Sequence, residues 1–203
     1  MTVEVPEIGW TTEVQLPASR TAVLVVDMQN DFVHERGALR VPTAAGTVGP
    51  IARLLSRARG AGVPVVYTQD WHSADDPEFR IWPPHCVAGT WGAEVVDALA
   101  PRPEETRIRK TTYDPFFGTD LGPALEHLGV EKLVIVGTVA NICVLHAAAS
   151  AALRGIRPVV PRDGVSALTE FDLHLAFHQV TFLYRGVPLA AGDGARFVPR
   201  ARA

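Results

Sequence analysis

Short apolar segments rich in β-branched residues alternate with amphipathic segments along most of the chain. Buried strands are predicted at 22–26, 63–68, 133–136 and 157–160, with a weaker, charged strand at 106–109 that suits a sheet edge. Helices are predicted at 50–59, 121–128, 144–154 and 171–184, and a last short strand at 187–190. This alternation is typical of an open parallel sheet covered on both faces. We therefore predict a three-layer α/β/α sandwich with a mainly parallel central sheet.

The chain is predicted to form one domain over residues 1–203, because its length suits a single well-buried core and it shows no internal repeat. Residues 1–20 are expected to form an N-terminal arm, and residues 191–203 a C-terminal tail that is loose from Val198 onward. The segment from Trp71 to Gly92 lacks periodicity and holds several prolines. A loop of that length in a compact domain is usually functional.

Composition narrows the class of protein. The net charge of −3 and the lack of a Lys/Arg cluster argue against nucleic-acid binding, and no apolar run is long enough to span a membrane. Two cysteines are too few for a disulfide framework, and the acidic start of the chain does not resemble a signal peptide. We therefore expect a cytoplasmic protein with reduced thiols.

Reactive side chains follow the carboxyl ends of four predicted strands. In chain order these are Asp27, then Asp70 with His72, then Lys110, and finally Cys143. Ligands bind beyond the carboxyl ends of the strands in open parallel sheets. The sequence therefore predicts a carboxylate, a candidate metal site, an amine and a thiol in one crevice.

Cys143 lies where a predicted strand gives way to a predicted helix. Gly137 breaks the strand and Asn141 is a plausible N-cap, which puts the thiol in the first helical turn. The positive helix end favours the thiolate, the nucleophilic form of cysteine. Two alternatives stay open: a lone buried cysteine is more often a packed side chain, and His146 is a candidate base for a Cys–His pair. Cys86, inside the irregular loop, is expected to be packed.

Asp70 and His72 alternate along an extended segment, so both can point to one side, and His85 returns after the loop. Oxygen and imidazole ligands suit zinc, iron or manganese. The alternative is a hydrogen-bonded loop without an ion. A second pair, His174 and His178, is spaced i, i+4 beside an apolar helix face, where a solvated or interface position is expected.

Several motifs resemble the isochorismatase-like hydrolases, also called the cysteine hydrolase superfamily. They are VDMQNDF at 26–32, RK at 109–110 and GTVANICV at 137–144. Within that superfamily, QDWH at 69–72 and WPPHCVAGT at 82–90, followed by GAE at 92–94, are most similar to nicotinamidases. The resemblance spans about residues 21–189. It implies the isochorismatase-like hydrolase fold.

The resemblance implies a catalytic triad of Asp27, Lys110 and Cys143. In it, the Lys110 ammonium lowers the pKa of the thiol, and Asp27 accepts the thiol proton and returns it to the leaving amine. It also implies an oxyanion hole made by the backbone N–H groups of Val139 and Cys143, at a cis Thr138–Val139 peptide.

The resemblance further implies a divalent metal, zinc first with iron or manganese as alternatives, that holds the pyridine nitrogen of nicotinamide or a water. The ligands it implies are Asp70, His72 and His85, with Glu78 as the fourth. The substrate pocket is expected to include aromatic walls and one polar contact, from Phe32, Trp82, Tyr113 and Gln29.

The activity that this implies is hydrolysis of a small carboxamide, nicotinamide to nicotinate and ammonia, through a thioester. Familiar nicotinamidases tend to have Thr-Asp where this chain has Ala140-Asn141. Another small amide or carbamoyl compound is therefore the alternative substrate, and an inactive binding or scaffold protein is an alternative of a different class. A homo-oligomer is expected by analogy with relatives.

Overall fold

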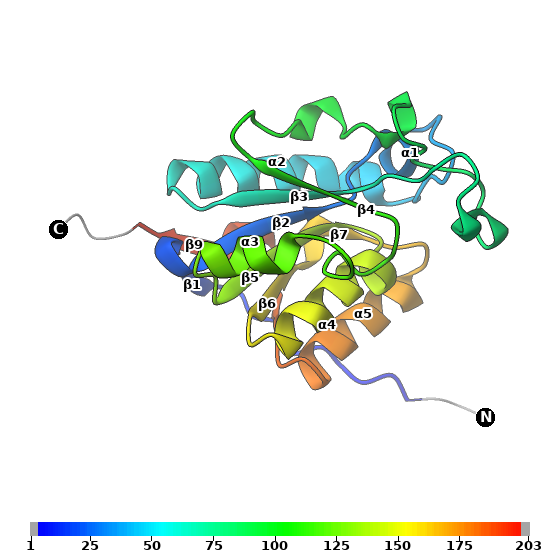
Figure 1. The fold of residues 1–203 in the computed structure, drawn as a ribbon. Coiled ribbons are helices and arrows are strands. Elements are labelled where there is room, and N and C mark those ends of the chain that lie inside the picture. Colours follow the sequence, from blue (N-terminus) through cyan, green and yellow to red (C-terminus); the bar gives the residue numbers. More distant parts are fainter. Residues whose placement is uncertain (1–3, 200–203) are drawn as a thin grey trace.

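The computed structural model describes residues 4–199, which form a seven-stranded sheet between layers of helices (Figure 1). The strand order is β4-β3-β2-β5-β6-β8, with β7 paired to β5, and every pair is parallel. The strands are β2 (Thr21–Val26), β3 (Val65–Asp70), β4 (Thr106–Lys110), β5 (Lys132–Thr138), β6 (Arg157–Pro161), β7 (Val165–Ser166) and β8 (Val187–Leu189). The predicted three-layer fold is confirmed, and β4 is an edge strand as its charges indicated.

The α-helices are α1 (Asn30–Val33), α2 (Ala44–Gly60), α3 (Leu121–His127), α4 (Leu145–Leu153) and α5 (Glu170–Phe182). A π-helical turn, Ala140–Val144, leads directly into α4. Short 3-10 turns lie at Ala18–Arg20, Pro77–Arg80, Trp91–Ala93, Asp97–Leu99, Arg162–Gly164 and Gly192–Gly194. Figure 1 shows α2 on one side of the sheet and α4 and α5 together on the other. No helix among residues 4–199 is long and apolar enough to cross a membrane.

Several predicted boundaries were wrong: β5 runs through Gly137 to Thr138, β3 begins at Val65, and α5 ends at Phe182. The helix predicted from Pro50 begins at Ala44, because Ala44 and Thr47 continue the buried stripe of Ile51 one turn earlier and Pro50 is tolerated within it. The strand predicted to end at residue 68 runs to Asp70, because β4 pairs with β3 up to the end of both strands.

The predicted arm and tail pair with each other over part of their length. Strand β1 (Val14–Pro17) lies parallel to β9 (Ala195–Val198) in a separate two-stranded sheet. The Arg57 guanidinium of α2 donates to backbone carbonyls of Gly192, Asp193 and Ala195, which fixes the segment before β9. The tail is therefore ordered up to Val198, whereas residues 200–203 lie outside the described residues. The single domain over residues 1–203 stays a prediction.

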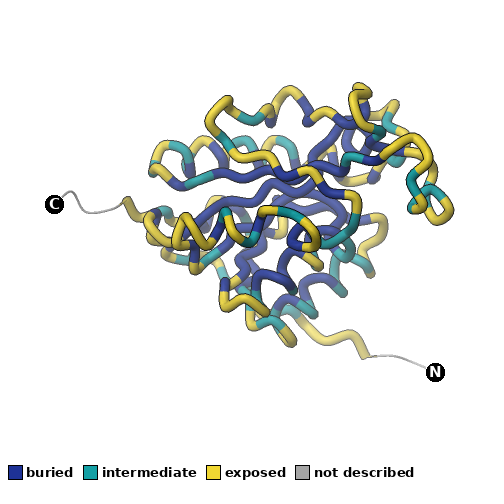
Figure 2. Tube along the Cα trace, in the orientation of Figure 1, coloured by how far each residue is buried: buried dark blue, intermediate teal, exposed yellow. Residues whose placement is uncertain are grey.

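The core is centred on β2 and β5, which Figure 2 shows as a dark blue layer inside the molecule. Every residue of β2 is buried, and so is every residue of β5 after Lys132. A strand covered on both faces needs continuous apolar residues, which explains why both strands lack polar alternation.

Gly137 brings these two central strands into close contact at their carboxyl ends. Its φ is +125°, and a Cβ at this position would lie 2.0 Å from the carbonyl oxygen of Val26. Only glycine fits both constraints. Asp27 leaves β2 at the next residue with a φ of +51°, so this contact sets the starting point of both the Asp27 side chain and the turn that carries Cys143.

Candidate active site

Three predicted residues meet at the carboxyl edge of the sheet. Asp27 follows β2, Lys110 ends β4, and Cys143 lies in the π-helical turn before α4. Lys110 Nζ lies 2.8 Å from Asp27 Oδ2 and 3.6 Å from Cys143 Sγ, and all three side chains are buried. The structure therefore brings the predicted triad together, while the catalytic roles of its members stay a prediction.

The Asp27 carboxylate is oriented by a second strand. Its Oδ1 accepts a hydrogen bond of 2.6 Å from the Thr68 hydroxyl on β3, which leaves Oδ2 to face Lys110. Burial raises the pKa of Asp27 above its usual value, the Lys110 charge opposes that rise, and the nearby Asp70 charge adds to it. A carboxylate with a raised pKa is suited to accept a proton and later donate it. Sequence reasoning missed Thr68, which as a buried strand residue gives no chemical signal.

The pKa of the Cys143 thiol is raised, contrary to the expectation that its surroundings favour the thiolate. Burial raises its pKa well above the usual value, and the Asp27 and Asp70 charges add to this, outweighing Lys110. The predicted N-cap was also wrong, because Val139 occupies the cap position and the Asn141 amide donates to Asp172 instead. A raised thiol pKa favours transfer of the sulfur proton during nucleophilic attack.

The Lys110 ammonium is held between two carboxylates. Besides Asp27, it donates to Asp70 Oδ1 through a short ion pair. Burial alone would lower the pKa of Lys110, but the Asp27 and Asp70 charges raise it well above its usual value. This amine is therefore a fixed positive charge rather than a proton donor.

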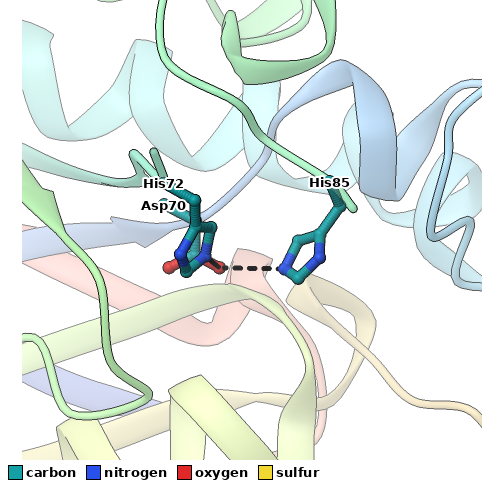
Figure 3. A group of neighbouring side chains, drawn as sticks. All are labelled: Asp70, His72 and His85. Atoms are coloured by element: carbon teal, nitrogen blue, oxygen red, sulfur yellow. Dashed lines mark ion pairs between the residues drawn. The ribbon is translucent and has the colours of Figure 1, made fainter. Parts of the chain in front are cut away.

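Asp70, His72 and His85 form a second cluster beside the triad (Figure 3). Asp70 Oδ2 lies 3.9 Å from His72 Nε2 and 4.0 Å from His85 Nε2, and one ligand atom from each residue lies within 4.8 Å of the others. His85 Nδ1 lies 2.8 Å from the Pro83 carbonyl oxygen, which leaves Nε2 of this ring facing Asp70. All three predicted residues are thus brought together.

The arrangement of His72 fits a metal ligand. Its side chain is fully buried, and its Nε2 has no hydrogen-bond partner among the described residues. Burial lowers the pKa of His72, but the carboxylates of Asp70 and Asp76 outweigh burial and raise it to about 9, so the site attracts positive charge. A divalent cation can take the place of that proton, and two imidazoles with one carboxylate form a known zinc ligand set with an open position.

The structure changes the assignment of two residues outside this cluster, Glu78 and Asp76. Glu78 lines the neighbouring pocket from the Pro77–Arg80 turn but does not belong to the cluster, so the structure does not support it as a fourth ligand. Sequence reasoning missed Asp76, whose Oδ2 lies 3.1 Å from His72 Nδ1. Carboxylates in that position orient the ligating ring. As an acid in an irregular loop, Asp76 gives no distinct sequence signal.

A pocket joins the triad and the metal cluster. It holds about 420 Å³ of empty space, counting its open mouth, and its walls include Phe32, Trp82, Tyr113, Val139 and Cys143. The Trp82 indole N–H donates to the Tyr113 hydroxyl at 3.0 Å, which ties two loops across the pocket. Phe32, Trp82 and Tyr113 therefore lie where the resemblance placed them, and their contact with substrate stays a prediction.

Gln29 does not line this pocket. Its side chain is buried and accepts from the Asp70 backbone N–H at 2.8 Å, while its amide donates to the carbonyls of Asp70 and Ala93. A buried amide that satisfies backbone groups on neighbouring segments is a support for Asp70, not a substrate contact. The expectation of a polar pocket contact from Gln29 was therefore wrong.

The turn around Cys143 has the features expected of an oxyanion hole. The Thr138–Val139 peptide is cis, as the resemblance implied. The Val139 N–H has no backbone acceptor among residues 4–199, and Val139 and Cys143 lie on the same pocket wall. Stabilisation of an oxyanion by these two N–H groups stays a prediction.

The alternative residues do not form a second site. His146 is exposed, and its Nδ1 lies 2.7 Å from the Ile142 carbonyl oxygen, so it is engaged by its own helix rather than by the thiol. Cys86 is buried, and burial raises its pKa, which confirms a packed thiol. His174 Nε2 lies 2.7 Å from the Pro6 carbonyl oxygen, and neither His174 nor His178 joins a metal-binding group within the described range.

The family model named Isochorismatase domain matches residues 21–191. A streptothricin hydrolase of Streptomyces noursei is 36% identical over 187 residues, which cover 90% of this chain and 63% of that protein. The ureidoacrylate amidohydrolase RutB of Agrobacterium fabrum is 33% identical over 157 residues, covering 64% of this chain and 69% of that protein. The chain thus spans about two thirds of the length of these relatives.

Several solved structures are also similar to this chain in fold and sequence. The N-carbamoylsarcosine amidase of Thermoplasma acidophilum has a TM-score of 0.79 at 37% identity, covering 86% of this chain and 97% of that one. The nicotinamidase/pyrazinamidase PncA of Bacillus subtilis has a TM-score of 0.79 at 30% identity, covering 84% and 99%. A pyrazinamidase of Pyrococcus horikoshii, solved in complex with zinc, has a TM-score of 0.75 at 30% identity, covering 89% and 99%. The chain therefore belongs to the isochorismatase family.

Proposed function

We propose that this chain is a cysteine-dependent amidohydrolase that hydrolyses a small carboxamide, with nicotinamide as the first candidate substrate. The observation that carries the proposal is the position of Lys110 Nζ between Asp27 and Cys143, together with the position of Cys143 on the wall of an apolar pocket. Names of similar proteins, among them a nicotinamidase/pyrazinamidase and two other amide-cleaving enzymes, support this reaction class.

The first half-reaction forms a thioester. Asp27 accepts the thiol proton as Cys143 sulfur attacks the amide carbon, and the backbone N–H groups of Val139 and Cys143 stabilise the oxyanion. The tetrahedral intermediate then breaks its C–N bond, and Asp27 returns the proton to the departing nitrogen, which leaves as ammonia. Lys110 keeps its proton throughout and balances the negative charge of the two carboxylates.

The second half-reaction consumes one water. Asp27 removes a proton from water as the hydroxide oxygen attacks the thioester carbon, and the C–S bond then breaks. Asp27 then returns this proton to the departing sulfur, so the products are a carboxylic acid and the regenerated Cys143 thiol, with Asp27 again a carboxylate. The same carboxylate thus serves as base in both halves, which suits its raised pKa.

We propose that Asp70, His72 and His85 hold a divalent ion, zinc first, with iron or manganese as alternatives. When bound, such an ion offers an electrophilic position to a lone pair on the substrate, such as a pyridine nitrogen. His85 and Cys143 both line the pocket, so a ring held at one end can present its carboxamide at the other. The zinc complex of the Pyrococcus pyrazinamidase supports the choice of metal.

The pocket favours uncharged, flat amides over amides that carry a carboxylate. Its walls are mainly aromatic and aliphatic, its charged groups are the acidic Asp70 and Glu78, and no lysine or arginine among residues 4–199 lines it. Apart from the proposed metal ion, a buried substrate carboxylate would meet no counter-charge there, and burying an unpaired charge is costly. This observation supports nicotinamide among the small amides and carbamoyl compounds that are the alternatives.

The test is ammonia release from a panel that contains nicotinamide, pyrazinamide, an aliphatic amide and an N-carbamoyl amino acid. We expect turnover of the two ring amides and little turnover of the carboxylate-bearing compound. Turnover of another amide with nicotinamide untouched would overturn the substrate and leave the reaction class standing. No turnover of any amide, with slow alkylation of Cys143, would favour an inactive binding or scaffold protein.

A further inference from the structure

Asp31, from the motif that supplies Asp27, is a buried charge that the proposed reaction does not use. It lies in α1 and is 8% exposed. Its Oδ2 accepts the backbone N–H of Cys86 at 2.7 Å, and its Oδ1 accepts the backbone N–H of Ala38 at 3.0 Å. A carboxylate buried among backbone donors makes charge-assisted hydrogen bonds, which are the stronger kind. Asp31 therefore anchors two loops at once.

The Cys86 end of this contact is directly beside a predicted metal ligand. Cys86 follows His85, and its carbonyl oxygen accepts the backbone N–H of His72 at 3.1 Å. The backbone of Cys86 is thus held at both of its polar groups: its N–H donates to Asp31, and its carbonyl oxygen accepts from His72. Cys86 also has a φ of +45°, a left-handed conformation that a residue other than glycine keeps only when its surroundings enforce it.

Gly92 leaves the space that the Asp31 carboxylate occupies. A Cβ at Gly92 would lie 2.1 Å from Oδ2 and 2.5 Å from Oδ1 of Asp31. Even alanine at this position would displace the carboxylate. The loop is therefore shaped around this one charged group, and the same loop carries His85.

We infer that Asp31 is a positioning residue for the metal site: it fixes the backbone of Cys86 and thereby holds His85 opposite Asp70. This inference rests on the metal site of the proposed function. It assigns no contact between Asp31 and the metal or the substrate.

Two variants test the inference from different sides. Asp31→Asn places an amide N–H₂ group against one of two backbone N–H groups, and Gly92→Ala pushes the unchanged carboxylate aside. Zn²⁺ affinity is measured by competition with a chromophoric chelator, and the ligand geometry by the visible spectrum of the Co²⁺ form. We expect both variants to bind Zn²⁺ about 10–100-fold more weakly than the unchanged chain, the usual effect of losing an outer-shell contact.

Matched controls separate this effect from a general loss of stability. Asp75→Asn changes an exposed carboxylate in the segment that joins His72 to His85. Gly46→Ala adds a methyl group where no atom lies within 4 Å. Both should bind Zn²⁺ as the unchanged chain does. Cys86→Gly in the Asp31→Asn background should restore part of the affinity, because glycine adopts a positive φ without steric cost. Urea unfolding of the same variants should show changes in Zn²⁺ affinity that are not matched by changes in stability, whereas a merely structural role predicts that both change together.

The outcomes are distinct. Weak Zn²⁺ binding by Asp31→Asn and Gly92→Ala, with normal controls and rescue by Cys86→Gly, supports the inference. Normal Zn²⁺ binding by both variants would overturn it and leave the metal site of the proposed function intact. Failure of the unchanged chain itself to bind Zn²⁺ would overturn both.

Discussion

At the residue scale, the buried charges of the candidate active site determine the pKa of its thiol. Two carboxylates, Asp27 and Asp70, surround one ammonium, Lys110, so the cluster already carries an excess negative charge. A thiolate at Cys143 would add a second one in a place where water cannot screen it. This explains why the pKa of the thiol is raised although a lysine lies 3.6 Å away.

The raised pKa of Cys143 predicts how its alkylation depends on pH. Only the thiolate reacts with iodoacetamide, and below the pKa its fraction rises about tenfold per pH unit. Because the pKa lies well above 9, the alkylation rate should climb steadily from neutral pH to pH 9 without a plateau. Mass spectrometry of the labelled peptides measures the rate.

Cys86 is the internal control for that measurement. It is buried, and it does not line the pocket through which the reagent reaches Cys143. We therefore expect it to be labelled far more slowly in the folded protein. A Cys143 rate that levels off at neutral pH would contradict the account of a protonated thiol.

Gln29 offers a second prediction at this scale. Gln29→Leu removes a buried amide that satisfies the Asp70 N–H and two carbonyls. Each buried group left without a partner costs about 1–3 kcal/mol, so the free energy of unfolding should fall by at least that amount. Zn²⁺ affinity should fall as well, because Asp70 loses its backbone support.

Urea unfolding and chelator competition measure these two effects. Gln15→Leu, at an exposed position of β1, is the matched control and should change neither. A Gln29→Leu variant with unchanged stability and metal affinity would show that Gln29 does not support Asp70.

At the scale of elements, the junction between β2 and β5 determines the site. The two strands pair from Thr21 to Val26 against Lys132 to Gly137, and the chain turns away from both at the next residues. The Asp27 side chain and the Cys143 turn therefore start from one point. The close approach at Gly137 is the feature that allows this.

Gly137→Ala should disrupt that junction. The added methyl meets the Val26 carbonyl and a backbone φ of +125°, so left-handed strain and overpacking together should lower the free energy of unfolding by about 2–5 kcal/mol. The distance between Asp27 and Cys143 should change with it, so amide hydrolysis should be lost in whatever fraction still folds. Thermal unfolding and ammonia release measure the two effects.

Gly155→Ala is the control for the conformational part. Gly155 has a φ of +78° but no atom within 4 Å of an added Cβ, so only left-handed strain of about 1–2 kcal/mol applies. Equal destabilisation by the two variants would mean that the close approach at Gly137 contributes nothing.

At the scale of the whole molecule, the sequence was enough to predict the layers and the strand ends that carry chemistry. Hydrophobic periodicity is local, so it located β2, β3, β5 and β6 even though several boundaries were wrong. Strand order and the β1–β9 pairing depend on contacts between distant segments, which no local pattern contains. The single-domain prediction was made from length and the lack of an internal repeat, and it stays untested.

The residues of the candidate site also fall into those that the sequence reveals and those that only the structure reveals. Reactive side chains at strand ends, such as Lys110 and His72, are visible in the sequence because their chemistry is rare in a core. Supporting residues are not: Asp31 and Asp76 look like ordinary loop or helix acids until the structure shows what they contact. Asn141 and Gln29 were misassigned because capping and pocket contacts depend on where a side chain points.

The assembly of the molecule is a further prediction. We propose a homo-oligomer, because several large apolar side chains on α4 and at the ends of α5 are exposed, among them Leu153, Phe171 and Phe182. Light scattering should give a mass above that of one chain, and Phe182→Ser should lower it. Phe117→Ser, at an equally exposed position before α3, is the matched control. A single-chain mass at micromolar concentration would overturn the proposal.

The measurement that tests the central claim most directly is amide hydrolysis by Cys143→Ala, assayed as ammonia release with the best substrate of the panel. The account predicts a loss of at least about 10⁴-fold in kcat, the scale seen when a catalytic nucleophile is removed. It also predicts that the variant still binds Zn²⁺, because the proposed ligands are Asp70, His72 and His85 rather than the second candidate group of Asp27, Asp70 and Cys143. Hydrolysis by Cys143→Ala at a rate close to that of the unchanged chain would contradict the account.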